Sequence, residues 1–157
     1  MKYDVIIVGA GPGGIFSAYE LTKKNPELKV GVFEEGNPLE KRKCPIDGKN
    51  VKACINCPTC AIMNGFGGAG AFSDGKYNIT NDFGGTLYEY IGREKALELM
   101  NYVDEINCAN GGGDTKKYST VGSKFKKICM QNKLTLLNAS VRHLGTDVNY
   151  IVLENIY

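Results

Sequence analysis

The hydrophobic pattern begins with a short β-rich run at residues 3–8, YDVIIV, which has no helical period. Such a run is typical of a strand buried on both faces in a parallel sheet. Residues 15–25, IFSAYELTKKN, place their apolar side chains on one side, and Asn25 followed by Pro26 ends the pattern, which predicts a helix. Residues 29–36, KVGVFEEG, predict a second strand. We therefore expect an α/β fold of the Rossmann-like type.

Further along the chain, residues 94–107, EKALELMNYVDEIN, carry a helical stripe of apolar side chains that should face a core. Residues 109–118, ANGGGDTKKY, are typical of a flexible linker. Residues 122–132 predict a second, basic helix with inward-facing apolar residues, and KLTLL at residues 133–137 predicts the strand that follows it.

A glycine-rich loop, GAGPGG, joins the first strand to the first helix. Gly9 permits a tight turn, Gly11 lets a pyrophosphate approach the backbone, and Gly14 lets helix and strand pack closely. Together with Pro12 and Gly13, these residues open a helix whose N–H groups and dipole favour phosphate. A strand before this G-x-G-x-x-G motif and a helix after it are the context that a dinucleotide site requires.

Glu34 stands at the end of the second strand, twenty residues after Gly14. This is the position from which an acid accepts hydrogen bonds from a ribose of the dinucleotide, and its charge disfavours NADP. Because the end of a strand is uncertain by a residue, Glu35 is the alternative for this role.

A second glycine-rich segment, GFGGAGAFSDGK at residues 65–76, favours FAD over NAD. A flavin ring needs close backbone contact and N–H donors to its heteroatoms. Gly67, Gly68, Ala69 and Gly70 could supply both.

Four of the six cysteines, Cys44, Cys54, Cys57 and Cys60, fall in an insertion at residues 36–64. Their spacing is compatible with an iron–sulfur cluster or with tetrahedral zinc. Cys57 and Cys60 also form a C-x-x-C pair of the kind found in dithiol oxidoreductases, which makes them candidate catalytic residues. A third interpretation is that the cysteines are reduced and structural.

The combination of VIIVGAGPGGIFSAYEL at residues 5–21, the cysteine cluster, GFGGAGAFSDGK and VRHLGTD at residues 141–147 resembles a family of bacterial FAD-dependent dehydrogenases with a glutathione-reductase-like FAD domain. The resemblance covers the whole chain. It implies that residues 1–157 are the N-terminal portion of a longer flavoprotein, whose remaining FAD-binding segments and C-terminal domain lie outside this chain.

The segment VRHLGTD holds the single histidine, His143, beside Arg142. One interpretation is an anion site near the flavin, with Arg142 as donor and His143 as an acid–base group. The other is a loop that caps the next helix through Thr146 or Asp147.

Composition narrows the function further. A net charge of +2 without a basic face interleaved with aromatic residues predicts no nucleic-acid partner. No apolar run approaches the roughly 20 residues of a membrane span, and Asp4 interrupts the only leader-like run, so we expect a cytoplasmic protein without a membrane partner.

The sequence thus predicts an FAD-dependent oxidoreductase that transfers hydride or electrons between the flavin and an unidentified small-molecule partner. The alternative is a non-catalytic nucleotide-binding module whose cysteines hold a structural metal. An NAD-binding protein is a third hypothesis, against which the second glycine segment argues.

Overall fold

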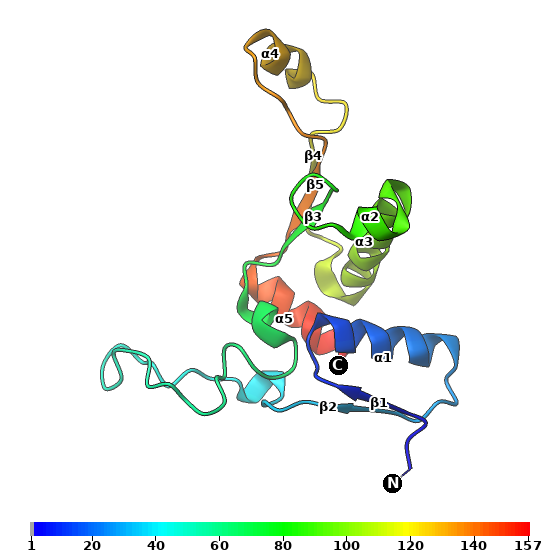
Figure 1. The fold of residues 1–157 in the computed structure, drawn as a ribbon. Helices are drawn as coiled ribbons and strands as arrows, with labels where there is room; N and C mark the ends of the chain where they lie inside the picture. The colour runs from blue at the N-terminus through cyan, green and yellow to red at the C-terminus, as the bar shows by residue number, and fades with distance from the viewer. Residues whose placement is uncertain (1) are drawn as a thin grey trace. The chain divides into compact units, whose positions relative to one another are not determined.

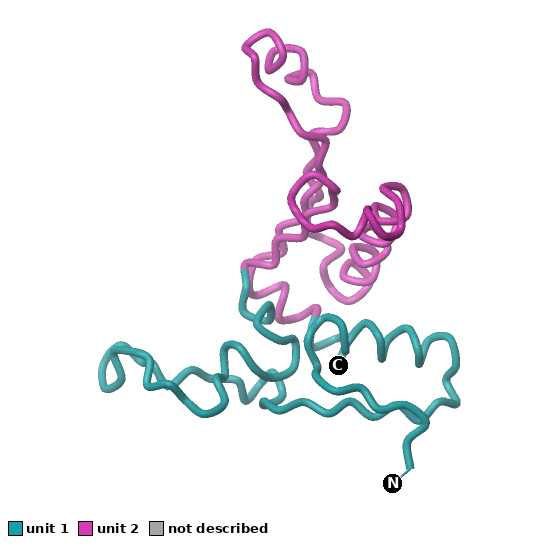
Figure 2. The backbone as a smooth tube through the Cα atoms, in the orientation of Figure 1, with its two compact units in different colours: residues 1–73, 153–157 teal, residues 74–152 magenta. Residues whose placement is uncertain are grey.

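A computed structural model describes residues 2–157, which divide into two compact units (Figure 2). Unit 1 comprises the chain up to residue 73 together with residues 153–157, and unit 2 comprises residues 74–152. In the described part of the chain, no helix is long and apolar enough to cross a membrane.

Unit 1 is built on a strand–helix–strand segment (Figure 1). Strands β1 (Val5–Val8) and β2 (Val30–Phe33) pair in parallel, with Val5 opposite Val30, and helix α1 (Pro12–Lys24) connects them. The expected strand, helix and strand are therefore confirmed, and the mixed α/β class with them. They form here because β1 consists of β-branched residues and β2 contains Val30, Val32 and Phe33, while Gly11 and Pro12 start the helix and Asn25 ends it.

The expectation that β1 is buried on both faces was wrong. Ile6 and Val8 are 60% and 87% exposed, whereas Val5 and Ile7 on the opposite face are partly covered. The physical reason is that the parallel sheet has two strands in the described residues, so helix α1 covers one face and the other faces solvent.

A long excursion leaves the sheet after β2. It includes the short 3-10 helix η1 (Leu39–Lys41) and returns at the 3-10 helix η2 (Gly68–Phe72). Between them the described residues 42–67 form neither helix nor strand. Figure 1 shows most of this excursion running away from β2 as an irregular trace. We call residues 36–64 the cysteine loop.

Unit 2 contains an antiparallel sheet in which β5 lies between the other two strands. The strands are β3 (Lys76–Ile79), β4 (Lys117–Ser119) and β5 (Ser140–His143). Helix α2 (Leu87–Ile91) precedes α3 (Arg93–Asn107), which packs near β3 and ends in the wide turn η3 (Cys108–Gly112). Helix α5 (Gly145–Ile156) follows β5.

The helix expected at residues 94–107 is confirmed as α3. Of its predicted apolar stripe, Ala96 and Ile106 are buried, Met100 and Val103 are partly covered, and Leu99 is 45% exposed. The apolar stripe of α3 is broader than the surface that the short antiparallel sheet of unit 2 can cover, so part of the stripe stays exposed.

Three later expectations were wrong. The predicted linker at residues 109–118 ends within β4, which begins at Lys117, and KLTLL at residues 133–137 forms no strand. The strand lies instead at Ser140–His143, and its last three residues begin the VRHLGTD segment, for which one of the two interpretations was a loop. Helix α4 (Phe125–Gln131) is shorter than expected, and its Phe125 and Ile128 are 55% and 52% exposed rather than inward.

Candidate nucleotide-binding site and cysteine loop

A crevice of about 280 Å³ lies at the carboxyl ends of β1 and β2 in unit 1. Its lining includes Gly9 from the turn after β1, Glu34 from the turn after β2, and Gly65 and Gly68 from beyond the cysteine loop. Parallel α/β sheets bind ligands at this edge, because the turns that follow the strands converge there.

The first glycine loop has the backbone that the motif predicts. Gly9 has a φ of +94°, which an L side chain rarely adopts. A Cβ atom on Gly14 would lie 1.9 Å from the Gly9 carbonyl oxygen, so helix and strand touch here. A Cβ atom on Gly11 or Gly13 would meet no atom within 4 Å. The start of α1 is therefore open on the side of Gly11 and Gly13.

The Glu34 carboxylate accepts three backbone hydrogen bonds. Its Oε2 accepts from Ala10 N at 2.7 Å, and its Oε1 accepts from the N atoms of Gly36 and Gly65, both at 2.9 Å. These bonds, led by the one from Ala10, lower the pKa of Glu34 below its ordinary value. The carboxylate is therefore held ionised between the two glycine loops.

Gly36 and Gly65 mark the two ends of the cysteine loop. A Cβ atom on Gly36 would lie 2.4 Å from the backbone N of Gly65, and Gly65 has a φ of +118°. Only glycine at both positions lets the two chain segments approach closely enough to share one oxygen of Glu34. The loop thus begins and ends at the candidate ribose acid.

The alternative acid, Glu35, has an exposed side chain. Its Oε1 accepts a hydrogen bond from Asn64 Nδ2 at 3.2 Å, and it also borders the crevice. Three backbone N–H groups hold the Glu34 carboxylate in place, whereas one side-chain amide, that of Asn64, bonds the Glu35 carboxylate.

The second glycine segment lies directly against the first. Gly67 N donates to the Ala10 carbonyl at 2.8 Å, and a Cβ atom on Gly68 would lie 3.2 Å from Gly11 Cα. Gly67 and Gly68 have φ values of +87° and +61°. From Gly68 the chain turns into η2, which leaves Ala69 and Gly70 exposed.

Arg42 holds the second glycine segment from within unit 1. The residue is 4% exposed, and its guanidinium stacks 4.8 Å from the centre of the Phe72 ring. Its nitrogens donate to the carbonyls of Ala61, Ile62, Phe66 and Gly68 at 2.9, 2.7, 2.6 and 2.9 Å. Burial lowers the pKa of Arg42 from its ordinary value, partly offset by the Glu34 charge.

A larger cavity of about 490 Å³ also lies beside Glu34 in unit 1. It is lined by Ala10 and Glu34, by the apolar side of α1, and by Phe66 and Tyr157, whose rings meet edge to face 4.9 Å apart. An apolar cavity beside an acid could accept a flat aromatic ring.

The four cysteines of the cysteine loop line one further cavity of about 250 Å³. The backbone N–H groups of Met63 and Ile62, and more weakly the Arg42 charge, lower the pKa of the Cys60 thiol. All six cysteines are free thiols. Among residues 2–157, no group of three or more Cys, His, Asp or Glu side chains is gathered closely enough to hold a metal ion.

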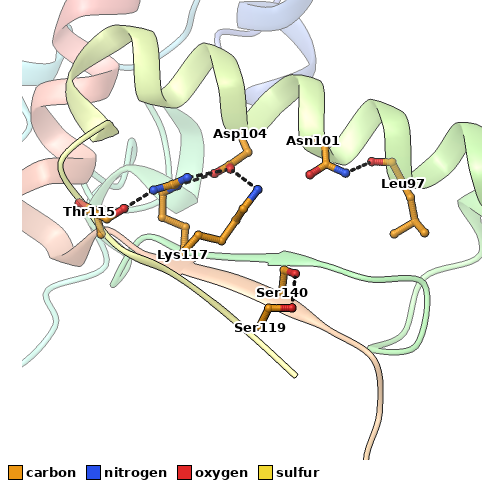
Figure 3. Close-up of polar contacts among 8 residues, drawn as sticks. Leu97, Asn101, Asp104, Thr115, Lys117, Ser119 and Ser140 are labelled. Carbon is orange, nitrogen blue, oxygen red and sulfur yellow. Dashed lines mark hydrogen bonds and ion pairs between the residues drawn. The ribbon is translucent and has the colours of Figure 1, made fainter. Parts of the chain in front are cut away.

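Arg142 and His143 lie in unit 2. The Arg142 Nε and Nη2 atoms bond Asp104 Oδ1 and Oδ2 at 2.7 and 3.0 Å, Nη1 bonds the Thr115 carbonyl, and Lys117 reaches Asp104 at 3.3 Å (Figure 3). The guanidinium that was a candidate anion donor is therefore occupied by a buried ion pair.

His143 is half exposed, and its Nε2 lies 3.6 Å from Asp74 Oδ2. Cys57 and Cys60 stand in the cysteine loop of unit 1. The four catalytic candidates thus do not form one constellation within either unit, and their catalytic role stays a prediction.

The first 38 residues of the chain, which include β1, α1 and β2, match a known family. Residues 1–38 match the Thi4 family. Thiamine thiazole synthase from Thermotoga maritima is 54% identical over 37 residues, which are 24% of this chain and 14% of that protein. The match to the family covers β1, the first glycine loop, α1, β2 and Glu34.

An uncharacterized protein from Clostridium beijerinckii is 28% identical over 152 residues, which are 96% of this chain. The chain spans 25% of the length of that relative. No solved structure matched the chain.

Sequence reasoning missed Arg42 and Asp104. The partners of Arg42 are backbone carbonyls 19 to 26 residues away, which leave no sequence signal. Asp104 sits on α3, 38 residues before Arg142, so the pair follows from the tertiary fold alone.

Proposed function

We propose that this chain forms the FAD-binding part of an oxidoreductase of the Rossmann-like type. The observation that carries the proposal is the crevice where the first glycine loop, the Glu34 carboxylate and the second glycine segment meet. When bound there, FAD would supply the hydride or electron chemistry, and the residues of the chain would bind and orient it.

The pyrophosphate would lie against Gly11 and Gly13 at the start of α1. The space beside both residues is open, and α1 is long enough to present a dipole whose positive end faces that space. No side chain obstructs the approach of phosphate oxygens to the backbone there.

Glu34 would bind a ribose hydroxyl. A carboxylate offers about four acceptor positions, and three of them are taken by backbone N–H groups, so roughly one remains on Oε2. That position can accept one hydroxyl hydrogen bond. The negative charge, fixed by the lowered pKa of Glu34, would repel a 2′-phosphate.

The second glycine segment supports FAD over NAD. Gly67 and Gly68 bring a bare backbone next to Gly11, and η2 exposes Ala69 and Gly70 beyond them. A planar ring that extends from the pyrophosphate could stack on such a surface without meeting a side chain. The similarity of residues 1–38 to the Thi4 family supports a nucleotide-binding enzyme at a coarser level.

The test is a direct binding measurement on the purified chain. The protein would be incubated with FAD, passed through a desalting column and scanned for flavin absorbance, and titrated in parallel with FAD, ADP and NAD⁺ by calorimetry. We expect FAD to be retained and ADP, its adenosine diphosphate half, to bind more weakly. Gly11→Val should abolish both interactions, because its side chain would fill the phosphate space.

Lys24→Gln, in the last turn of α1, is the matched control and should bind like the wild-type chain. A folded protein that binds none of the three nucleotides would overturn the proposal. Binding of NAD⁺ in place of FAD would favour the nicotinamide alternative, and FAD-free protein with stoichiometric zinc would favour the metal-stabilised module.

A further inference from the structure

The four cysteines of the cysteine loop border one shared cavity. Cys44, Cys54, Cys57 and Cys60 all line the cavity of about 250 Å³, and the remaining lining is Asn56 together with apolar residues such as Ile46 and Ile55. The four thiols are thus the titratable groups of this cavity. A cavity of this chemistry suits a soft cation, because thiolates are the ligands that soft metals prefer.

Backbone hydrogen bonds fix two of the four cysteines, Cys54 and Cys60. Asn56 N donates to Cys54 Sγ at 3.5 Å, and Asn56 reaches this geometry with a φ of +52°, which is uncommon outside glycine. At the other end of the cysteine cluster, the carbonyl of Cys60 accepts hydrogen bonds from Met63 N at 3.1 Å and Asn64 N at 2.8 Å, which fixes the backbone of this cysteine. An N–H group that donates to a cysteine sulfur orients it and supports it as a metal ligand.

The loop has few means of holding its shape. Residues 42–67 contain no helix or strand, and Ile46 and Ile55 are 43% and 59% exposed. Local order comes from Asp47, whose Oδ1 accepts hydrogen bonds from the N atoms of Lys49, Asn50 and Val51, and from the Arg42 bonds to the carbonyls of Ala61 and Ile62. Loops of this length without secondary structure are usually functional or disordered, and a metal supplies the folding free energy that such a segment otherwise lacks.

We propose that Cys44, Cys54, Cys57 and Cys60 form a four-thiolate metal centre that takes either Zn²⁺ or the iron of an iron–sulfur cluster. No three of these sulfurs stand at ligating distance in the described chain, so binding draws the loop inward around the metal. The three closely spaced cysteines wrap one side of the centre, and Cys44 completes it from the start of the loop.

Arg42 fits this assignment. Its guanidinium bonds the carbonyls of Ala61 and Ile62, the two residues after Cys60, so the last ligand is anchored. Four thiolates around Zn²⁺ carry a net negative charge, which the guanidinium beside Cys60 partly offsets. The proposal is independent of the nucleotide site, since no residue of the glycine loops is a ligand.

The experiment measures metal binding directly in the full chain. Protein purified without oxygen is analysed for zinc, iron and acid-labile sulfide, then stripped and titrated with Co²⁺, whose absorption reports tetrahedral thiolate coordination. We expect stoichiometric metal in the purified protein and saturable Co²⁺ binding. Zinc without sulfide identifies a mononuclear site, and iron with sulfide and a visible shoulder that dithionite bleaches identifies a cluster.

Single variants test the ligand set. Cys54→Ser, Cys57→Ser and Cys60→Ser should each weaken Co²⁺ binding by more than about 100-fold, since each removes a thiolate ligand. Cys108→Ser and Cys129→Ser remove the two cysteines outside the loop and should leave the affinity unchanged. Metal binding should also protect the loop from cleavage by trypsin. This protection can be measured in Cys108→Ser and Cys129→Ser, which keep all four loop cysteines, so the test does not depend on whether the loop variants fold.

Two results would overturn the proposal. One is the absence of stoichiometric metal and of saturable Co²⁺ binding in folded wild-type protein. The other is Co²⁺ binding that the three loop variants leave intact and that Cys108→Ser or Cys129→Ser removes.

Discussion

Gly14 lies so close to Gly9 that a Cβ atom on Gly14 would stand 1.9 Å from the Gly9 carbonyl oxygen. Real Cβ atoms do not approach other heavy atoms this closely, so Gly14→Ala must push α1 away from β1. We expect the free energy of unfolding to fall by about 1–3 kcal/mol. Urea denaturation followed by far-ultraviolet circular dichroism measures it, because the chain contains no tryptophan for fluorescence. Unchanged stability would contradict the close packing described here.

Gly11→Ala should separate binding from folding. Gly11 has an ordinary φ of −76°, and a Cβ atom there meets nothing within 4 Å, so the substitution should lower stability by less than about 1 kcal/mol. The same methyl group enters the space proposed for the pyrophosphate, so FAD affinity should fall at least about 10-fold. Calorimetric titration of the folded variant checks this, and wild-type affinity would place the phosphates elsewhere.

Glu34→Gln should destabilise unit 1 although it keeps the size of the side chain. Glutamine has one acceptor oxygen, whereas Glu34 accepts on both oxygens, so either the bond from Ala10 or the pair from Gly36 and Gly65 is lost. We expect a loss of about 1–3 kcal/mol, measured by urea denaturation. Glu35→Gln is the matched control and should change stability by less than about 0.5 kcal/mol, since its side chain is exposed.

Arg42→Lys should loosen the cysteine loop while it keeps the charge. A lysine ammonium cannot reproduce a planar fork that donates to four carbonyls and stacks on Phe72. We expect a loss of about 2 kcal/mol or more and faster trypsin cleavage within the loop. Lys43→Gln, at the exposed neighbouring position, is the control. It removes the trypsin site after residue 43, and cleavage at the other sites of the loop should proceed as in the wild-type chain. Equal cleavage rates in all three proteins would show that Arg42 does not hold the loop.

The pair of Asp104 and Arg142 should make unit 2 sensitive to acid. Burial raises the pKa of Asp104, but the hydrogen bonds and charge of Arg142, with a smaller effect of Lys117, lower it by more, so the pKa lies below its ordinary value. The folded-state pKa is therefore below the unfolded value of about 3.9. The stabilisation is present above that pH and is lost as the pH falls through the folded-state pKa.

Asp104→Asn tests this pH dependence. At neutral pH it should lower the free energy of unfolding by about 3–5 kcal/mol, because Arg142 is left buried without its counter-ion. The variant should also lose part of the slope of stability against pH below about pH 4. Asp82→Asn breaks the exposed pair with Arg93 and should cost less than about 1 kcal/mol. Similar losses in the two variants would argue against a structural role for the buried pair.

The sequence was sufficient to predict the secondary structure of residues 5–34, because the signals for these elements lie close together along the chain. The strand, the glycine loop, the helix and the acid after the second strand follow one another within 34 residues, and each is set by neighbours along the chain. Gly9 illustrates this, since a turn between a strand and a helix at this spacing requires its positive φ.

Elements set by distant contacts were not predictable in the same way. The strands of the antiparallel sheet are three or four residues long and pair across tens of residues, as Tyr77 does with Arg142. KLTLL looks more like a strand than SVRH does, yet Leu134 in it is 61% exposed and the strand forms at Ser140–His143. A short strand is selected by the partner it meets, and the partner lies elsewhere in the sequence.

Gly36 and Gly65 both donate to one oxygen of Glu34, so the cysteine loop of unit 1 begins and ends at the same place. A chain that passed from Gly36 to Gly65 by a shorter path could still present the same N–H groups to the carboxylate, although it would lose the guanidinium that now steadies η2. The position is therefore a graft point, where segments of different length and chemistry can be exchanged while the Glu34 carboxylate keeps its hydrogen bonds, as long as the new segment replaces Met63 and Asn64 in lining the crevice.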